Sequence, residues 1–377
     1  MEQKSPSAPA RTPSPSEIAS SLGARVIGQE QAVREMSVAL AKYLAGLRSG
    51  NLLLIGPSGT GKTTVMRSVE SYLSSHPSLA KRATVVRFHA QVLAEAAEQG
   101  RPGEVVLRRL LDRAADELGR DADLEHLLAR VRRGLVFVDE VDKIRSKVGG
   151  ETNRSGIRAQ EALLTVIENE SVPFDLPAWA GGGTVRVDTS GVLFVAGGAF
   201  EGLYDDVFDR VTIGDDKGSL QTVTVVEGGR VREELHFQLR DWLRTEDLFN
   251  YGMSPQFLSR FDSVVLLQDL GPDALVKIFL EGADSGLREA QRYFASQGVH
   301  LAVSPAAIRR VAVEAARRPR MGARALREVF HRVIRGYEFD PGAAVSGAGG
   351  ALMLDEAEVE RALADPGASA GESGGIT

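Results

Sequence analysis

The sequence predicts an α/β fold, in which a parallel β-sheet is flanked by helices and followed by a smaller, mainly helical C-terminal domain. Short apolar runs of strand length alternate with segments of helical periodicity from Ala32 to Leu267, which is the pattern of a parallel sheet with helices on its faces. The run at 134–138 is almost purely aliphatic or aromatic, as expected for a strand buried on both faces. After Gly271 helical periodicity takes over, so a second domain is expected to begin there.

The elements of the first domain follow from this pattern in order. Apolar residues at three- and four-residue spacing predict a helix over 32–47, and the run at 51–55 predicts a strand that leads into a glycine-rich turn and a helix from Lys62. Four further apolar runs predict strands, and helical patterns lie between most of them. The strands are expected at 83–88, 134–138, 191–196 and 263–267, and the helices include 103–118 and 158–168.

The second domain is expected to contain one long helix at 273–297, a helix at 306–317 capped by Ser304 and Pro305, and a third helix at 322–337. A short strand at 351–354 and a helix to about Ala364 complete it. The ends of the chain, 1–16 and 366–377, are predicted to be flexible tails, because they cannot bury enough surface to offset their chain entropy. The expected domains are therefore 17–271 and 272–365.

The composition excludes several classes of protein. With 377 residues, of which 43% are hydrophobic, the chain can bury a sizeable core, so a wholly disordered protein is excluded. No apolar run approaches the ~20 residues of a membrane-spanning helix, so no membrane partner is expected. The count of 0 cysteines removes disulfides and thiolate chemistry and fits a cytoplasmic protein. A net charge of -6 does not favour nucleic acid as a partner, although a local basic patch stays open.

A complete phosphate-binding pattern, G-x-x-x-x-G-K-[ST], follows the expected strand at 51–55. Glycines allow the backbone to aim several N–H groups at one phosphate, and the positive end of the following helix adds to the attraction. Lys62 is expected to reach the β- and γ-phosphates, and the Thr63 hydroxyl to coordinate Mg²⁺. The residues expected to bind the nucleotide here are Gly56, Pro57, Ser58, Gly59, Thr60, Gly61, Lys62, Thr63 and Thr64.

Two adjacent carboxylates, Asp139 and Glu140, end the apolar run at 135–138. Asp139 would hold Mg²⁺ directly or through water, and Glu140 would polarise the water that attacks the γ-phosphate. Together with the phosphate-binding pattern, this pair predicts a Mg²⁺-dependent nucleoside triphosphatase in which Lys62, Asp139 and Glu140 have catalytic roles.

Five segments, in order along the chain, carry a resemblance to a known family. They are the segment 26–32, which begins Val26-Ile27-Gly28-Gln29, the acidic segment 139–144, the segment 194–200 with Gly197-Gly198, the segment 255–261 and the segment 321–327. Their residues resemble those of the AAA+ ATPases and, within them, the ClpX protein unfoldases. The pair Gly197-Gly198 resembles the ClpX form of the sensor-1 strand, where other members carry a polar residue. The similarity runs from about Ile18 to Leu363.

The resemblance implies further roles. Val26 and Ile27 would pack on the adenine of ATP, and Arg324 would touch the γ-phosphate from the small domain of the same chain. Arg260 would be an arginine finger that acts on the nucleotide of a neighbouring subunit, which implies a homo-hexameric ring. A guanidinium suits this task because it stabilises the charge of the phosphoryl-transfer transition state. For Arg324, which lies in an arginine-rich stretch, a solvated basic face stays an alternative.

The sequence departs from the ClpX pattern at three places. The four-cysteine zinc domain of that family is expected to be missing, because the chain has 0 cysteines. Arg101 stands where the family carries the aromatic of its central-pore loop, and it would either grip acidic peptide or phosphate backbone or be a solvated loop tip. Asp215 and Asp216 replace the aromatic anchor of the peptidase-docking loop, so a ClpP-type peptidase is not expected as a partner. The segment 147–154 is placed where a second pore loop belongs.

These observations predict an ATP- and Mg²⁺-dependent, ClpX-like ATPase that acts as a ring and couples hydrolysis to motion on a macromolecule of unidentified nature. The first alternative is a processive unfoldase subunit that feeds a protease. The second is a nucleotide-gated assembly switch with slow turnover, acting on a protein or nucleic-acid partner.

Overall fold

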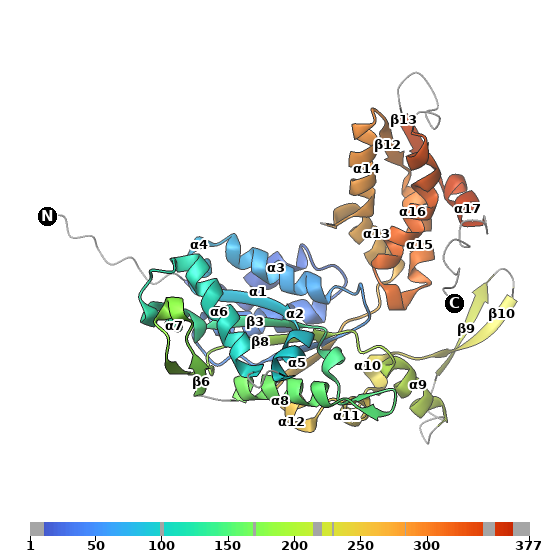
Figure 1. The fold of residues 1–377 in the computed structure, drawn as a ribbon. Helices are drawn as coiled ribbons and strands as arrows, with labels where there is room; N and C mark the ends of the chain where they lie inside the picture. The colour runs from blue at the N-terminus through green and yellow to red at the C-terminus, as the bar shows by residue number, and fades with distance from the viewer. Residues whose placement is uncertain are drawn as a thin grey trace, which may run out of the picture. The chain divides into compact units, whose positions relative to one another are not determined.

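The computed structural model describes residues 11–98, 102–168, 171–213, 221–227, 230–282, 284–341 and 351–364. Over these ranges the chain forms two compact units (Figure 1). The first contains the described part of Met1–Ser20, with Gln31–Gly56 and the described part of Met66–Leu266. The second contains Ser21–Glu30, Pro57–Val65 and the described part of Leu267–Thr377. Three helices have residues in both units: α1 (Pro15–Gly23), α2 (Glu30–Leu44) and α3 (Lys62–Ser74).

The first unit is built on a five-stranded sheet with the strand order β11-β1-β8-β3-β2. Every neighbouring pair is parallel, which confirms the predicted α/β fold class. The three inner strands are buried along their whole length, whereas the edge strand β2 also carries exposed positions, as expected for strands covered on both faces. The strands are β1 (Leu52–Ile55), β2 (Thr84–His89), β3 (Gly134–Asp139), β8 (Leu193–Gly198) and β11 (Ser263–Leu266).

Helices cover this sheet and pack on one another. Helix α6 packs against β2 and against α5, α7 and α8 (Figure 1), and it buries Leu107, Leu110 and Leu111 at helical spacing. The helices of this unit after α3 are α4 (Pro77–Ala80), α5 (Gln91–Glu98), α6 (Pro102–Leu118), α7 (Leu124–Val131), α8 (Arg154–Glu168), α9 (Leu203–Ile213), α10 (Leu239–Trp242), α11 (Thr245–Tyr251) and α12 (Pro255–Leu258), with 3-10 turns η1 (Val141–Ile144) and η2 (Ala178–Ala180).

Three antiparallel hairpins of the described chain were not predicted from the sequence. Their strands are short or mixed in polarity, so their apolar periodicity is weak. The turn of the first hairpin is formed by Gly149 and Gly150, which have φ of 60° and 84°, the backbone of a two-residue hairpin turn. The pairs are β4 (Lys147–Val148) with β5 (Glu151–Thr152), β6 (Val172–Asp175) with β7 (Thr184–Val187), and β9 (Gln221–Glu227) with β10 (Arg230–His236).

The second unit is mainly helical, as predicted. Helix α15 packs against α13, α16 and α17, and α14 packs against α16 and the strand β12. The strand expected at 351–354 is confirmed as β13, which pairs in parallel with β12. Ser304 caps α15 by accepting a hydrogen bond from the Ala307 N–H at 3.2 Å. The elements are α13 (Pro272–Glu281), α14 (Gly286–Ser296), β12 (His300–Val303), α15 (Pro305–Ala316), η4 (Pro319–Met321), α16 (Arg324–Phe339), β13 (Ala351–Leu354) and α17 (Glu356–Ala364).

The single long helix predicted at 273–297 is wrong, because the chain breaks between α13 and α14. Gly282 ends α13, and its N–H still donates to the Ile278 carbonyl at 2.8 Å. A Cβ atom at Gly282 would lie 2.4 Å from that carbonyl oxygen, so this turn requires glycine. Ser285 then starts α14 by accepting from the Arg288 N–H at 3.3 Å. Apolar spacing continued through the break and hid these two end signals.

The expected flexible tails and the expected domain boundary stay predictions. The tails predicted at 1–16 and 366–377 fall mostly outside the described residues, and α1 begins at Pro15. The domain boundary near Gly271 stays a prediction. Among the described helices, none has the length and apolar character required to cross a bilayer.

Candidate active site

The phosphate-binding pattern forms a tight loop between β1 and α3. Gly56 follows β1, and its N–H donates to the Gly198 carbonyl of β8 at 3.2 Å, so the loop starts from a fixed point on the sheet. Gly59 and Gly61 have φ of 80° and 112°, values that residues with a side chain rarely adopt. The Nζ atom of Lys62 donates to a carbonyl of the loop itself at 2.9 Å. The backbone therefore has the curvature that phosphate binding requires.

The remaining predicted residues of the loop lie in its outer part and in the first turn of α3. Pro57, Ser58 and Thr63 are partly exposed, and Thr64 is exposed. Thr60 is 1% exposed, and its hydroxyl donates to the Pro57 carbonyl at 2.8 Å. The loop thus combines a buried internal brace with exposed groups that a ligand can reach.

The second unit brings the segment that contains Arg324 directly against this loop. The Ala323 N–H donates to the Gly59 carbonyl at 3.0 Å. A Cβ atom on Gly59 would lie 2.3 Å from the Met321 carbonyl oxygen, and one on Gly322 would lie 2.6 Å from the Gly59 carbonyl carbon. Two glycines therefore allow the two backbones to touch, and Arg324 begins α16 beside this contact with an exposed side chain.

Gln29 braces the loop from the N-terminal side, and the sequence reasoning missed this role. Its side chain is 2% exposed; it donates to the Thr60 carbonyl at 2.9 Å and to the Gln268 carbonyl at 2.8 Å. The Gln29 amide oxygen accepts from the Gln268 N–H at 2.8 Å. The only sequence signal was its place after Val26-Ile27-Gly28, where Val26 is buried and Ile27 is partly buried.

The acidic pair lies at the carboxyl end of β3. Asp139 is 8% exposed and its Oδ1 atom accepts from the Glu140 N–H at 3.0 Å, while the Ala90 N–H donates to the Asp139 carbonyl at 2.8 Å. Glu140 has a φ of 57°, an uncommon value for a residue with a side chain that concentrates at functional sites. Its side chain is half exposed, and its Oε2 atom lies 3.7 Å from Nδ1 of His89.

The strand order places these groups at one edge of the sheet. Asp139 ends β3 and Gly56 follows β1, and only β8 lies between these two strands. Since carboxyl ends of parallel strands meet at the same edge, the start of the loop and the acidic pair belong to the same edge. Open α/β sheets bind their ligands at this edge.

Arg260 lies away from the acidic pair, in the turn after α12. Its side chain is 43% exposed and forms an ion pair with Glu168 at the end of α8. Its carbonyl accepts from the side-chain amide of Asn51 at 3.0 Å, which ties this turn to the residue before β1. Among the described residues, the side chain of Arg260 contacts neither Asp139 nor Glu140, so it is free of the chain's own acidic pair.

The donor atoms fit a nucleotide-bound magnesium ion. Thr63 supplies a hydroxyl in the first turn of α3, and Asp139 supplies a carboxylate at the end of β3; such oxygens are the ligands that Mg²⁺ prefers. In the described ranges no three His, Cys, Asp or Glu side chains gather as a metal site. The fit to Mg²⁺ is therefore one of ligand chemistry, a hydroxyl and a carboxylate oxygen, to which phosphate oxygens of a nucleotide would add.

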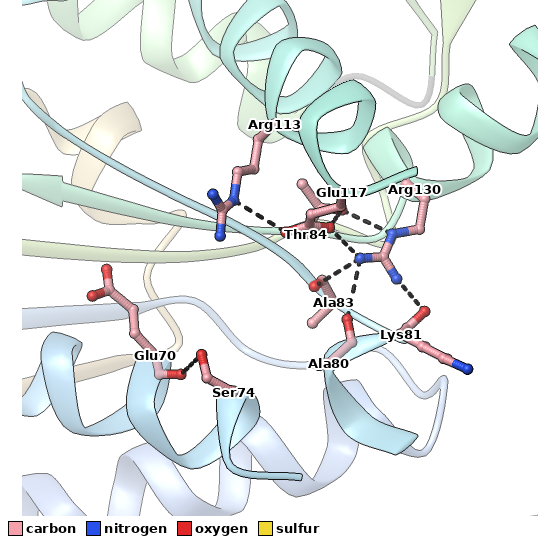
Figure 2. Close-up of polar contacts among 9 residues, drawn as sticks. All are labelled: Glu70, Ser74, Ala80, Lys81, Ala83, Thr84, Arg113, Glu117 and Arg130. Atoms are coloured by element: carbon pink, nitrogen blue, oxygen red, sulfur yellow. Dashed lines mark hydrogen bonds and ion pairs between the residues drawn. The ribbon is translucent and has the colours of Figure 1, made fainter. Parts of the chain in front are cut away.

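A separate cavity of about 1890 Å³ in the first unit is lined by both acidic and basic side chains. Among the lining residues is Arg130, whose partly buried guanidinium donates to Thr84 Oγ1 at 3.0 Å and pairs with Glu117 (Figure 2). The same guanidinium donates to carbonyls of the loop before β2, including those of Ala80 at 3.1 Å and Ala83 at 3.2 Å. These contacts lie at the amino end of β2, opposite the acidic pair, so the network braces the fold and is assigned no catalytic role.

The family described as AAA domain (Cdc48 subfamily) matches residues 47–264. The "ATP-dependent Clp protease ATP-binding subunit ClpX 3" of Methylococcus capsulatus is 32% identical over 350 residues, which cover 86% of this chain and 75% of that protein. The chain is a ClpX-like member of the AAA+ ATPase family. The ClpX subunit of Azotobacter vinelandii is 29% identical over 343 residues, covering 85% of this chain and 72% of that protein.

Membership of the ClpX-like AAA+ ATPases confirms the resemblance read from the sequence. The matched region contains the phosphate-binding loop, the acidic pair and Arg260. Two of the places where the sequence departs from the family pattern are not described by the structure. Arg101 and residues 214–216 lie outside the described residues, so their roles stay predictions. The segment 147–154 contains the hairpin β4–β5, whose strand residues are exposed.

Proposed function

We propose that this ClpX-like AAA+ chain hydrolyses ATP as a homo-oligomeric ring, six-membered by its resemblance, and uses the energy to remodel a protein substrate. The observation that carries the proposal is the backbone contact between the phosphate-binding loop and the start of α16, where the Ala323 N–H donates to the Gly59 carbonyl at 3.0 Å. Through this contact, which lies within the second unit, a change in the loop on ATP binding or phosphate release would act on α16. Such coupling is what a remodelling ATPase needs.

Each predicted site residue has a place in this proposal. Lys62 and the loop N–H groups bind the phosphates, with Pro57, Ser58 and Thr64 at the rim of the loop. Glu140 orients the attacking water, which suits its exposed position at the end of β3. Val26 and Ile27 pack against the base. Thr63 and Asp139 hold Mg²⁺, which when bound neutralises charge on the phosphates.

Two arginines would complete the site from different directions. Arg324, at the start of α16, would contact the γ-phosphate in the same chain. Arg260, exposed and separate from the chain's own acidic pair, would serve the nucleotide of a neighbouring copy. An arginine finger supplied in this way stabilises the transition-state charge, and it makes hydrolysis depend on assembly.

The proposal favours remodelling without an obligate peptidase. Its relatives are named as ATP-binding subunits of Clp protease, so a processive unfoldase that feeds a protease is the second candidate. The acidic residues Asp215 and Asp216, where an aromatic docking anchor is expected, argue for the first candidate. A nucleotide-gated assembly switch is the third, and nucleic acid is the less favoured partner for a chain of net charge -6.

The test is the ATPase activity of the wild type and of Glu140→Gln, with and without an unfolded protein. We expect the wild type to hydrolyse ATP faster with unfolded protein, and Glu140→Gln to bind ATP but turn over at least about 100-fold more slowly. Near-normal turnover by Glu140→Gln would overturn the role of Glu140. Stimulation by DNA or RNA instead of protein, or a negligible rate with every partner, would overturn protein remodelling.

A further inference from the structure

Asp142 is a buried carboxylate that the proposed mechanism does not use. It lies in the turn η1, directly after the segment that carries Asp139 and Glu140, and it is 2% exposed. Burying a charged carboxylate is costly unless hydrogen bonds and an opposite charge compensate it. Its Oδ1 atom accepts from the Ala199 N–H at 3.1 Å, and its Oδ2 atom lies 4.0 Å from Nζ of Lys143.

The position of this carboxylate explains why the strand β8 ends in glycine. A Cβ atom on Gly198 would lie 2.7 Å from Oδ1 of Asp142 and 2.7 Å from an edge carbon of the Phe200 ring. Phe200 is itself buried and has a φ of 51°, which is uncommon for an aromatic residue. The side chain that position 198 lacks would therefore occupy the space that the Asp142 carboxylate fills.

A chain of hydrogen bonds runs through this contact. The Lys143 N–H donates to the Glu140 carbonyl at 3.0 Å, which closes the turn η1 around Asp142. Asp142 then accepts from Ala199, and the Gly198 carbonyl accepts from the Gly56 N–H at 3.2 Å. The turn that presents Glu140 is thus linked to the end of β8 and to the first residue of the phosphate-binding loop, within one unit of the chain.

We propose that Asp142 is a positioning residue for ATP hydrolysis: by fixing the end of β8 to the turn η1, it holds Glu140 in the orientation in which it can activate water. The inference rests on the proposed ATPase function, and it predicts loss of turnover without loss of ATP binding. A misplacement of a reacting group by about 1 Å is enough to slow a reaction by about 100-fold.

The test compares Asp142→Ala and Asp142→Asn with the wild type. Asp142→Ala removes the acceptor of the Ala199 N–H, so kcat should fall about tenfold or more while the Kd for ATP stays close to the wild-type value. Asparagine keeps an acceptor oxygen in the same place, so Asp142→Asn should restore most of kcat. A purely structural role would lower the melting temperature of Asp142→Ala without this split between kcat and Kd.

Asp247 supplies the matched control, because it is also a buried carboxylate of the first unit. It is 7% exposed, and its Oδ1 atom accepts from Nε of Arg210 at 2.8 Å. Asp247→Ala should lower the melting temperature but leave the kcat of the folded protein unchanged. Wild-type kcat in Asp142→Ala, or an equal fall of kcat in both alanine variants, would overturn the inference. Equal loss in Asp142→Asn and Asp142→Ala would also overturn it, since the hydrogen bond would not be the cause.

The outcomes separate this inference from the proposed function. If the wild type hydrolyses ATP, Glu140→Gln does not, and Asp142→Ala is fully active, the ATPase assignment stands and the role of Asp142 fails. If the wild type hydrolyses no ATP under any condition, the proposed function fails and the role of Asp142 fails with it.

Discussion

The contact between the phosphate-binding loop and the start of α16 can be tested by adding a single methyl group to Gly59. The Cβ atom of Gly59→Ala would lie 2.3 Å from the Met321 carbonyl oxygen, 3.2 Å from the Arg324 nitrogen and 3.3 Å from the Ala323 nitrogen. All three atoms belong to the backbone, so no side chain can rotate away to relieve the overlap. Either the loop or the segment 321–324 must move.

The expected cost has two parts. Alanine at a φ of 80° costs about 1–2 kcal/mol relative to glycine, because its Cβ approaches the neighbouring carbonyl. Overpacking against fixed backbone adds about 1–3 kcal/mol. A loop that reaches its binding conformation only at a cost of about 2 kcal/mol or more loses ATP affinity by the same free energy, so the Kd for ATP should rise at least about 30-fold.

Gly298→Ala is the control for backbone strain alone. Gly298 has a φ of 75°, close to that of Gly59, and a Cβ atom there would meet nothing within 4 Å. We expect Gly298→Ala to lower the free energy of unfolding by about 1–2 kcal/mol and to bind ATP like the wild type. Calorimetric titration with ATP and Mg²⁺ measures both affinities. Wild-type affinity in Gly59→Ala, or equal losses in the two variants, would refute the role of this contact.

Three further predictions concern other parts of the first unit. Arg260→Ala should reduce the ATPase rate of the assembled protein by about 10³-fold without loss of ATP binding. The control Glu168→Gln removes the ion pair of Arg260 and should leave the steady-state rate unchanged. A normal rate in Arg260→Ala would refute the assignment of Arg260 as an arginine finger. Arg130→Ala should lower the free energy of unfolding by about 3 kcal/mol. Arg113→Ala removes a 53% exposed partner of the same carboxylate, Glu117, and should lower it by less than about 1 kcal/mol. Denaturant titration measures both losses, and equal losses would contradict this prediction. Burial, and next the charge of Asp142, raises the pKa of Tyr251 to about 12. Because this folded pKa exceeds the unfolded value of about 10, the contribution of Tyr251 to the free energy of unfolding should be fully present below pH 10 and be lost as the pH rises toward 12. Tyr251→Phe should remove this part of the pH dependence.

The fold was predictable where the signal is local and repeated. The runs that became β1, β3 and β8 are almost entirely apolar because both faces of these strands are covered, so their burial could be read directly from the residues. The break between α13 and α14 was not predictable in the same way. Gly282 ends α13 and Ser285 starts α14 because packing fixes where the apolar face of each helix turns. The residue types alone did not reveal this, since the apolar spacing continues through both positions.

The residues of the candidate site show the same difference between local sequence patterns and contacts across the chain. The loop residues and the acidic pair form contiguous patterns because each pattern binds one small group, so they could be found one segment at a time. Gln29 could not be found in this way, because its partner Gln268 is 239 residues away in the sequence. The role of its buried amide is evident only when the two segments lie in contact. Gly322 is similar: its role is set by the approach of Gly59, which no spacing along the chain encodes.

The residues of the phosphate-binding loop, for which we propose a role in energy transfer, belong to both units. Gly56 belongs to the unit with the sheet, and Pro57–Val65 belongs to the helical unit. The loop is held on one side by the bond from the Gly56 N–H to the Gly198 carbonyl and on the other by the bond from the Ala323 N–H to the Gly59 carbonyl. In the proposed function, a ligand that reshapes the loop near Gly59 would act on α16 through the second of these bonds. Coupling free energy is reciprocal. In the proposed function, a partner that binds the second unit and weakens this bond would therefore change the affinity for ATP by the same factor by which ATP changes the affinity for that partner.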